Sequence, residues 1–284
     1  TDEYLKKFDR ESVIKSLIKK DNPIIFDVGA NVGDTLVEFK EWWPSSEVHC
    51  FEPQEECWPE LESKVLHNNY KDVFINKHAV GDVEKDAEFY SHEITSGQSG
   101  LHKINSDSLD SINLSLLKKD KNLEKYKSTI NHKRTVKVIP LINYINREKL
   151  HHIDLMKIDT QGHEPEVLSG FKDSLSIVDV IVTELMFYDF YERSLSFSDI
   201  ENYLLPAGFR LFDISHISKN PMNGRTDWVD VMNKCLHGLV ARNTEFPHIW
   251  DLPRIQDAYE EIRARFRNEL LHLKSYAVVI NLLP

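Results

Sequence analysis

The densest group of residues able to do chemistry is the turn Asp27-Val28-Gly29-Ala30-Asn31-Val32-Gly33, which follows a short apolar run. Gly29 and Gly33 permit a tight turn and let a ligand approach the backbone closely. A dinucleotide site would favour a third glycine, because its pyrophosphate settles over a helix N-terminus. Asp27 and Asn31 instead suit a ligand that carries both an ammonium and a carboxylate group. A plain strand-to-helix turn is the alternative interpretation.

A second carboxylate, Glu52, ends the next apolar run, 19 positions after Gly33. An acidic residue at this place can accept hydrogen bonds from both ribose hydroxyls of an adenosine. The alternative is a surface glutamate that precedes Pro53. The spacing of the turn and Glu52 together is more specific than either feature alone, and it predicts a cofactor that contains adenosine.

A third group lies in the segment 153–164, where apolar residues alternate with charged ones. This pattern predicts a buried strand that delivers Asp159 to its carboxyl end. Gly162 permits a turn, and Glu164 opens the following helix with chemistry suited to a helix N-terminus. An aspartate at such a strand end serves as a general base, a metal ligand or a structural cap, and the residues alone leave these roles open.

The elements that must position these residues follow from the apolar patterns along the chain. Strands are predicted at 24–29, 48–53, 73–80, 87–90, 152–159, 178–185, 209–214 and 235–242, and helices at 3–20, 34–43, 54–67, from 164, at 197–205 and at 254–276. Strands that alternate with helices at this spacing predict an α/β fold with a doubly wound, mainly parallel sheet. Two antiparallel strands near the end would fit a methyltransferase-type sheet better than a dinucleotide fold.

These patterns divide the chain into an N-terminal helix (1–21), a main domain (22–245) with a polar insertion (103–133), and a helical extension (246–284). In the extension, apolar residues recur at three- and four-residue steps, which predicts an amphipathic helix. Its apolar face would be a large exposed patch on a monomer. A homodimer formed through this helix and packing against the main domain are therefore both open.

Composition excludes some partners. A formal net charge of -11 disfavours a nucleic-acid backbone, which needs a basic surface. The three cysteines show no metal-ligand spacing, so we predict no metal site and a reducing, cytoplasmic location. The sequence opens without a signal peptide, and no apolar run approaches the roughly 20 residues that a membrane span needs.

The segments FDVGANVGDT, CFEPQ, AVGD and IDLMKIDTQGHEPEVLSGF resemble the FkbM-type methyltransferases, and the resemblance covers roughly residues 22–243. It implies a class I methyltransferase (Rossmann-like) fold with a seven-stranded sheet. It also implies S-adenosylmethionine as the cofactor and a hydroxyl of a sugar, glycan or secondary metabolite as the acceptor. Family members typically carry an acidic residue where this chain has Gln161, a difference that removes one negative charge.

The same resemblance assigns site residues. It places Asp27, Gly29, Asn31, Gly33 and Glu52 at the cofactor, Val80 within 79–82 at the adenine, and Asp159 and Glu184 at the transfer site. A sugar hydroxyl is a poor nucleophile and would benefit from a base, for which Asp159, His163 and Glu184 are the candidates. His163 is included because histidine titrates nearest to neutral pH.

Three further residues are weaker candidates. Ser99 lies in a loop at 95–100 whose hydroxyls and flexible backbone can fold over the cofactor, although a simple surface loop is as good an interpretation. His102 and Trp228 are candidates for the wall of the acceptor site, where a tryptophan stacks on a sugar face or belongs to the core.

Two other functions compete with methyl transfer. A non-catalytic module would keep the fold and use the C-terminal helix for assembly, but it has no physical need for Asp27, Glu52 and Asp159. A nicotinamide-dependent dehydrogenase is disfavoured by the missing third glycine.

Overall fold

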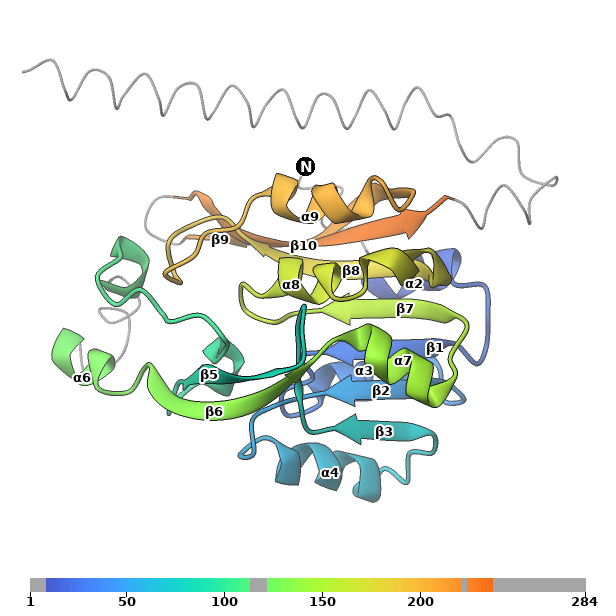
Figure 1. The fold of residues 1–284 in the computed structure, drawn as a ribbon, viewed down its shortest axis with the longest axis horizontal. Coiled ribbons are helices and arrows are strands. Elements are labelled where there is room, and N and C mark those ends of the chain that lie inside the picture. The colour runs from blue at the N-terminus through green and yellow to red at the C-terminus, as the bar shows by residue number, and fades with distance from the viewer. Residues whose placement is uncertain (1–8, 113–121, 221–223, 237–284) are drawn as a thin grey trace, which may run out of the picture. The chain divides into compact units, whose positions relative to one another are not determined.

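The computed structural model describes residues 9–112, 122–220 and 224–236 (Figure 1). The predicted helix at 254–276, the homodimer proposed for it and the domain boundary at 245 lie outside the described residues. No helix within the described ranges is long and apolar enough to cross a membrane.

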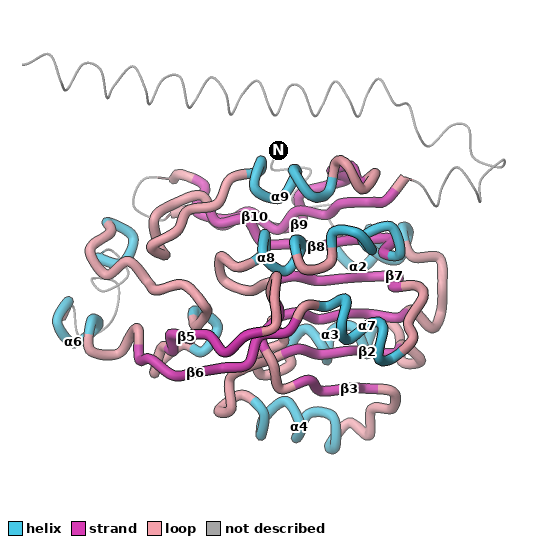
Figure 2. Tube along the Cα trace, in the orientation of Figure 1, coloured by secondary structure: helices cyan, strands magenta, loops and turns pink. Residues whose placement is uncertain are grey.

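A seven-stranded sheet forms the centre of the fold, in the order β3-β2-β1-β7-β8-β10-β9 (Figures 1 and 2). Its strands are β1 (Ile24–Val28), β2 (Glu47–Phe51), β3 (Val73–Asn76), β7 (Ile153–Ile158), β8 (Val178–Met186), β9 (Phe209–Lys219) and β10 (Thr226–Cys235). Pairing from β3 through β8 is parallel, and β10 pairs antiparallel with both β8 and β9. The prediction of a doubly wound, mainly parallel sheet is confirmed.

Helices cover both faces of this sheet. One face carries α2 (Arg10–Leu17), α3 (Asp34–Trp42) and α4 (Trp58–His67), and the other carries α7 (Leu141–Glu148), α8 (Glu164–Ser169) and α9 (Phe197–Leu204). In α3 the buried Leu36 and Phe39 recur one turn apart, which gives this helix its apolar stripe. Pro59 lies in the first turn of α4, the one place where a helix tolerates proline without losing a hydrogen bond.

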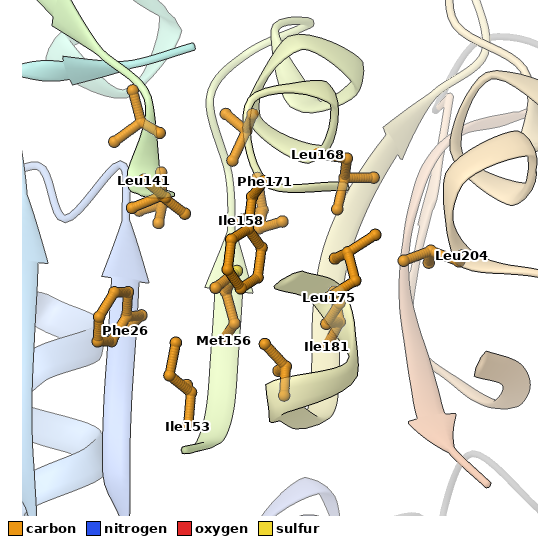
Figure 3. Close-up of a cluster of buried hydrophobic side chains, with 14 of the residues drawn as sticks. Phe26, Leu141, Ile153, Met156, Ile158, Leu168, Phe171, Leu175, Ile181 and Leu204 are labelled. Atoms are coloured by element: carbon orange, nitrogen blue, oxygen red, sulfur yellow. The ribbon is translucent and has the colours of Figure 1, made fainter. Parts of the chain in front are cut away.

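The larger core lies under α7, α8 and α9. Figure 3 shows how Phe26, Met156 and Ile181 from three strands meet Leu168 and Leu204 from two helices. All five side chains are at most 2 % exposed. Burial of this kind stabilises a fold by about 1.5–3 kcal/mol for each large apolar side chain.

A second, smaller sheet interrupts the alternation of strands and helices along the chain. The apolar run at 73–80, predicted as one strand, is split into β3 and β4 (Ala79–Val80), and β4 belongs to a three-stranded sheet with β6 (His132–Ile139) and β5 (Lys85–Ser91). β6 and α7 were missed by the sequence reading. The alternation in β6 places lysines and an arginine on its exposed positions, so it resembled the polar insertion that precedes it.

β10 was not predicted from the sequence. β10 ends at Cys235, where the predicted strand 235–242 begins, and residues 237–242 lie outside the described ranges. The strand carries Asp227, Asp230 and Lys234 and therefore lacks the apolar run on which the prediction relied. The N-terminal helix is described from Arg10, within the predicted range 3–20.

Candidate active site

A cavity of about 380 Å³ lies at the carboxyl ends of β1, β2 and β7. The strand order reverses between β1 and β7, and such a switch point is where open α/β sheets bind ligands. Seven of the predicted site residues line this cavity: Gly29, Asn31, Glu52, Val80, Ser99, Asp159 and His163. Three do not: Asp27, Gly33 and Glu184.

Gly29 is required by the packing of two strands. Its φ is +89°, and a Cβ atom added there would lie 1.9 Å from the carbonyl oxygen of Asp159. The direction of the missing side chain is therefore filled by the backbone of the neighbouring strand end, and the role of Gly29 in letting a ligand approach stays a prediction. Gly33, with φ +87°, caps α3 in the left-handed conformation, and its missing side chain leaves space for Leu61.

Glu52 and Asn31 are joined at the floor of the cavity. One carboxylate oxygen of Glu52 accepts the backbone N–H of Asn31 at 2.7 Å, and the other accepts the N–H of Gln54 at 2.7 Å. Asn31 has φ 47° and uses its side-chain oxygen to accept from Val32 N–H and Ser96 Oγ. Each Glu52 oxygen keeps a second lone pair for a hydroxyl donor. Burial raises the pKa of Glu52 to about 7.

Asp27 lies behind the turn, outside the cavity. It is fully buried, neither carboxylate oxygen has a hydrogen-bond partner among the described residues, and Lys157 Nζ is 3.6 Å away. Burial raises the pKa of Asp27, against the attraction of Lys157. The two residues are paired across β1 and β7, so the same face of the sheet carries both. Asp27 does not line the cavity, and the cofactor role predicted for it stays a prediction.

Two carboxyl groups meet where β7 and β8 end. Asp159 Oδ2 accepts from Lys157 Nζ at 3.1 Å, and Asp159 Oδ1 accepts from Gln161 Nε2 at 2.6 Å. Gln161 Nε2 also donates to Glu184 Oε2 at 3.2 Å. Burial, and next the charge of Asp159, raise the pKa of Glu184 well above its usual value, which favours its protonated form. Asp159 is the carboxylate of this pair that faces the cavity.

His163 is a weaker base than the sequence suggested. It is only 6 % exposed, and Nδ1 lies 3.2 Å from His102 Nε2. Burial, and next the neighbouring His102, lower the pKa of His163 to about 3. The expectation that His163 titrates near neutrality is therefore wrong, and a group of this basicity takes up a proton poorly at pH 7.

The loop 95–100 crosses the cavity. Ser96 Oγ donates to Asn31 Oδ1 at 2.9 Å, and the Gln54 amide donates to the Ser96 carbonyl at 3.3 Å. Ser99 Oγ accepts the N–H of His92, which directly follows β5. On the far side, Tyr191 Oη lies 3.1 Å from the Gln98 carbonyl. The loop 95–100 therefore contacts the turn at Asn31 on one side and, on the other, Tyr191, which donates to Gln161.

Among the described residues, two groups of side chains come close enough to hold a metal ion: His102, His163 and Glu166, and His152, Asp154 and Asp179. In the first, Arg193 binds Glu166 at 2.5 Å, and in the second, Lys20 binds Asp154 at 2.9 Å. These cations already neutralise the carboxylates, so we assign no metal to either group.

The sequence reading missed several residues of the site. Lys157 and Gln54 lie within segments that carry the family resemblance but had no role assigned to them, and Tyr191 lies in no motif. Trp228, a candidate for the acceptor wall, stacks on His216 with ring centroids 4.6 Å apart and does not line the cavity.

A buried carboxyl beside the cavity gives a pH-dependent stability. Glu164 is 1 % exposed, and one of its oxygens accepts from Thr160 N–H and Gly162 N–H. Burial raises its pKa from 4.5 to about 7. Its stabilising contribution is therefore fully present below pH 4.5 and is lost as the pH rises through 7. We expect Glu164→Gln to gain stability relative to wild type between pH 5 and pH 8, by on the order of 3 kcal/mol.

Urea unfolding at the two pH values measures this gain. The buried amide of the variant adds an offset that does not depend on pH, so the readout is the change in the difference between the two proteins. The exposed Glu55→Gln serves as a control without such a change. A difference that is equal at both pH values would show that Glu164 ionises as an ordinary glutamate.

Comparison with known proteins gives concordant matches. The methyltransferase FkbM domain matches residues 27–211. The 2-O-methyltransferase NoeI of Sinorhizobium fredii (strain NBRC 101917 / NGR234) is 27% identical over 200 residues, which cover 68% of this chain and 75% of that protein.

Solved structures also align with the chain. Methyltransferase FkbM from Methylobacillus flagellatus KT has a TM-score of 0.47 and 14% identity over 81% of this chain. The alignment covers 50% of that protein, so the chain spans about half its length. Magnesium protoporphyrin IX methyltransferase from Synechocystis PCC 6803 has a TM-score of 0.41 and 11% identity, and the alignment covers 79% of this chain and 77% of that one.

Proposed function

Because the chain belongs to the FkbM methyltransferase family, we propose that it is an S-adenosylmethionine-dependent O-methyltransferase whose acceptor is a hydroxyl of a sugar or glycan. One observation carries the proposal: a single cavity is lined by Glu52, suited to a ribose, and by Asp159, suited to an acceptor hydroxyl. The name of the relative NoeI, a 2-O-methyltransferase, supports oxygen as the methylated atom.

The residues present fit the cofactor. The cavity volume lies within the usual range for small-molecule sites, about 300–1,000 Å³. Glu52 and the backbone of the Asn31 turn would hold the adenosine and amino-acid parts, and Val80 would contact the adenine. Bound S-adenosylmethionine supplies an electrophilic methyl group. The loop 95–100 lines the cavity and would help to exclude water from it once the cofactor is bound, which favours displacement by a positioned hydroxyl.

Asp159 acts on the acceptor. Its carboxylate accepts the proton of the hydroxyl as the oxygen attacks, and Lys157 holds the carboxylate in place through Oδ2. The raised pKa of Glu184 favours its protonated form, and Glu184 does not line the cavity, so this scheme assigns the base to Asp159.

Cofactor binding tests the assignment of Glu52. We expect Glu52→Gln to weaken S-adenosylmethionine binding about 10–150-fold, because it removes charge-assisted hydrogen bonds worth about 1.5–3 kcal/mol. Calorimetry measures the change, with Glu55→Gln as the matched control on the exposed surface of the same segment. Equal affinities of Glu52→Gln and wild type would show that the ribose lies elsewhere.

The reaction itself is tested with S-adenosylmethionine carrying a labelled methyl group. A panel of mono- and oligosaccharides is offered as acceptors, each beside its 2-deoxy counterpart. Label in the saccharide but not in the 2-deoxy sugar would support 2-O-methylation, and label in both would place the methyl group at another hydroxyl. Cofactor binding without label in any saccharide would contradict the proposed acceptor class.

A further inference from the structure

Both polar groups of the Gln161 side chain have hydrogen-bond partners at the transfer site. Nε2 donates to Asp159 Oδ1 at 2.6 Å and to Glu184 Oε2 at 3.2 Å, while Oε1 accepts from Tyr191 Oη at 2.6 Å. A carboxamide has two N–H donors and a carbonyl acceptor, so each group has a partner here. One side chain therefore links two carboxyl groups and a phenol.

The surroundings fix which way the amide points. Tyr191 is 1 % exposed, and its hydroxyl has two acceptors in reach, Gln161 Oε1 and the more distant Gln98 carbonyl. Turning the amide over would aim Oε1 at two carboxyl groups and leave Nε2 facing the phenol. The nitrogen therefore faces the carboxyl pair.

The backbone is shaped to present this side chain. Gln161 has φ 57° and Gly162 has φ 96°, both in the left-handed region. Glu164 Oε1 holds the turn by accepting from Thr160 and Gly162. A non-glycine residue in this conformation costs about 1–3 kcal/mol, and such residues cluster at functional sites.

Negative charge dominates around the pair. Besides Lys157, the charged and titratable groups facing Asp159 and Glu184 are Asp27 from β1, Glu164 from α8, Asp230 from β10 and Tyr191 from the loop after β8. Asp230 is the direct cross-strand partner of Glu184. Lys157, together with Arg10 at Asp27 and Asp230, offsets part of this negative charge, and a neutral donor between Asp159 and Glu184 relieves repulsion without adding charge.

On the basis of the proposed function, we propose that Gln161 is a positioning residue that holds Asp159 and Glu184 as a pair sharing a single negative charge. The amide orients the Asp159 carboxylate toward the acceptor hydroxyl while Glu184 keeps its proton. The burial of Glu184 and the charge of Asp159, which together raise the pKa of Glu184, support this division of roles.

Two variants of nearly equal length test the proposal. Gln161→Glu places a third carboxyl against the pair, and Gln161→Met removes both donors without adding charge. For Gln161→Glu we expect the pH at which kcat rises to increase by about one unit or more, since a proton or cation must now separate three carboxyl groups. Added Ca²⁺ or Mg²⁺ should raise kcat and Tm of this variant and leave wild type unchanged. For Gln161→Met we expect a fall in kcat of about 10-fold or more and an unchanged KM for the cofactor.

The second readout does not need activity. The Tm of Gln161→Glu should fall relative to wild type as the pH rises from 5 to 8, because the added carboxyl loses its proton against two others. Gln98→Glu adds the same charge to the nearby loop and should show a smaller pH dependence. If Gln161→Glu shows no pH-dependent loss of Tm and no response to cations, the proposal is overturned.

These outcomes separate the two proposals. Wild-type protein that binds no S-adenosylmethionine would contradict the proposed function, and the stability readout would still decide the role of Gln161. If Gln161→Glu does not fold, Gln161→Met decides: an unshifted pH profile with normal kcat would show that the amide has only a structural role.

Discussion

Replacing Asp159 by Asn is expected to lower kcat by about 10²–10⁴-fold, because the acceptor hydroxyl loses the base that takes its proton. Cofactor affinity should change little, since Asp159 acts at the acceptor. The comparison that makes the test sharp is Glu184→Gln. Because burial and the charge of Asp159 raise the pKa of Glu184 and favour its protonated form, its neutral analogue should retain most of the turnover. Single-turnover kinetics at saturating cofactor, together with calorimetry, measure both quantities for each variant.

The opposite pattern would reassign the base. If Glu184→Gln loses turnover and Asp159→Asn keeps it, Glu184 is the base that takes the proton of the acceptor hydroxyl. Near-normal rates in both variants would leave positioning and water exclusion as the whole source of catalysis. Asp173→Asn, on the exposed surface, controls for the general effect of removing an aspartate.

The largest expected loss of stability comes from Gly29→Ala. Its added Cβ would overlap the carbonyl of Asp159, and the residue would keep φ at +89°. The central strands β1 and β7 would have to separate, so we expect a loss of more than about 4 kcal/mol. This is a large fraction of the roughly 5–15 kcal/mol that holds a domain together.

Two other glycines separate the effect of steric overlap from the effect of backbone strain. Gly224 has φ +72° but no atom within 4 Å of an added Cβ, so its alanine variant should show only the backbone strain of about 1–2 kcal/mol. An added Cβ at Gly97 meets Asn31 at an ordinary 3.9 Å, and Gly97→Ala should lie within about 0.5 kcal/mol of wild type. Denaturant unfolding of the three variants should give this order. A Gly29 variant no less stable than the Gly224 variant would mean that the two strand ends separate easily.

Local motifs explain which parts of the site could be predicted. The turn around Gly29 and the carboxylate at Glu52 lie at the ends of short apolar runs, and the carboxyl ends of adjacent parallel strands share one edge of a sheet. Sequence spacing therefore sufficed to bring Gly29, Asn31, Glu52 and Asp159 to one cavity. The identification as an FkbM-type methyltransferase on the same motifs is confirmed.

What could not be predicted depends on tertiary packing. Asp27 looks as available as Asn31 in the sequence, but alternation along β1 points its side chain to the sheet face behind the turn, toward Lys157. Tyr191 reaches Gln161 from a loop 30 positions away, without any motif. The charged residues of β10, Asp227, Asp230 and Lys234, interrupt its apolar run, so its composition concealed a strand of the main sheet.

The pairing of β1 with β7 sets an order of events during synthesis. Asp27 pairs with Lys157, which is made 130 positions later. At the usual rates of elongation, about 5–20 residues per second, the interval between the two is about 6–26 s. During this interval, the edge of β1 that will pair with β7 is open, and Asp27 lacks Lys157. β1 is therefore complete on the ribosome well before β7, its partner, is made. An unpaired strand edge of this kind can pair with other chains and misfold, or be bound by a chaperone.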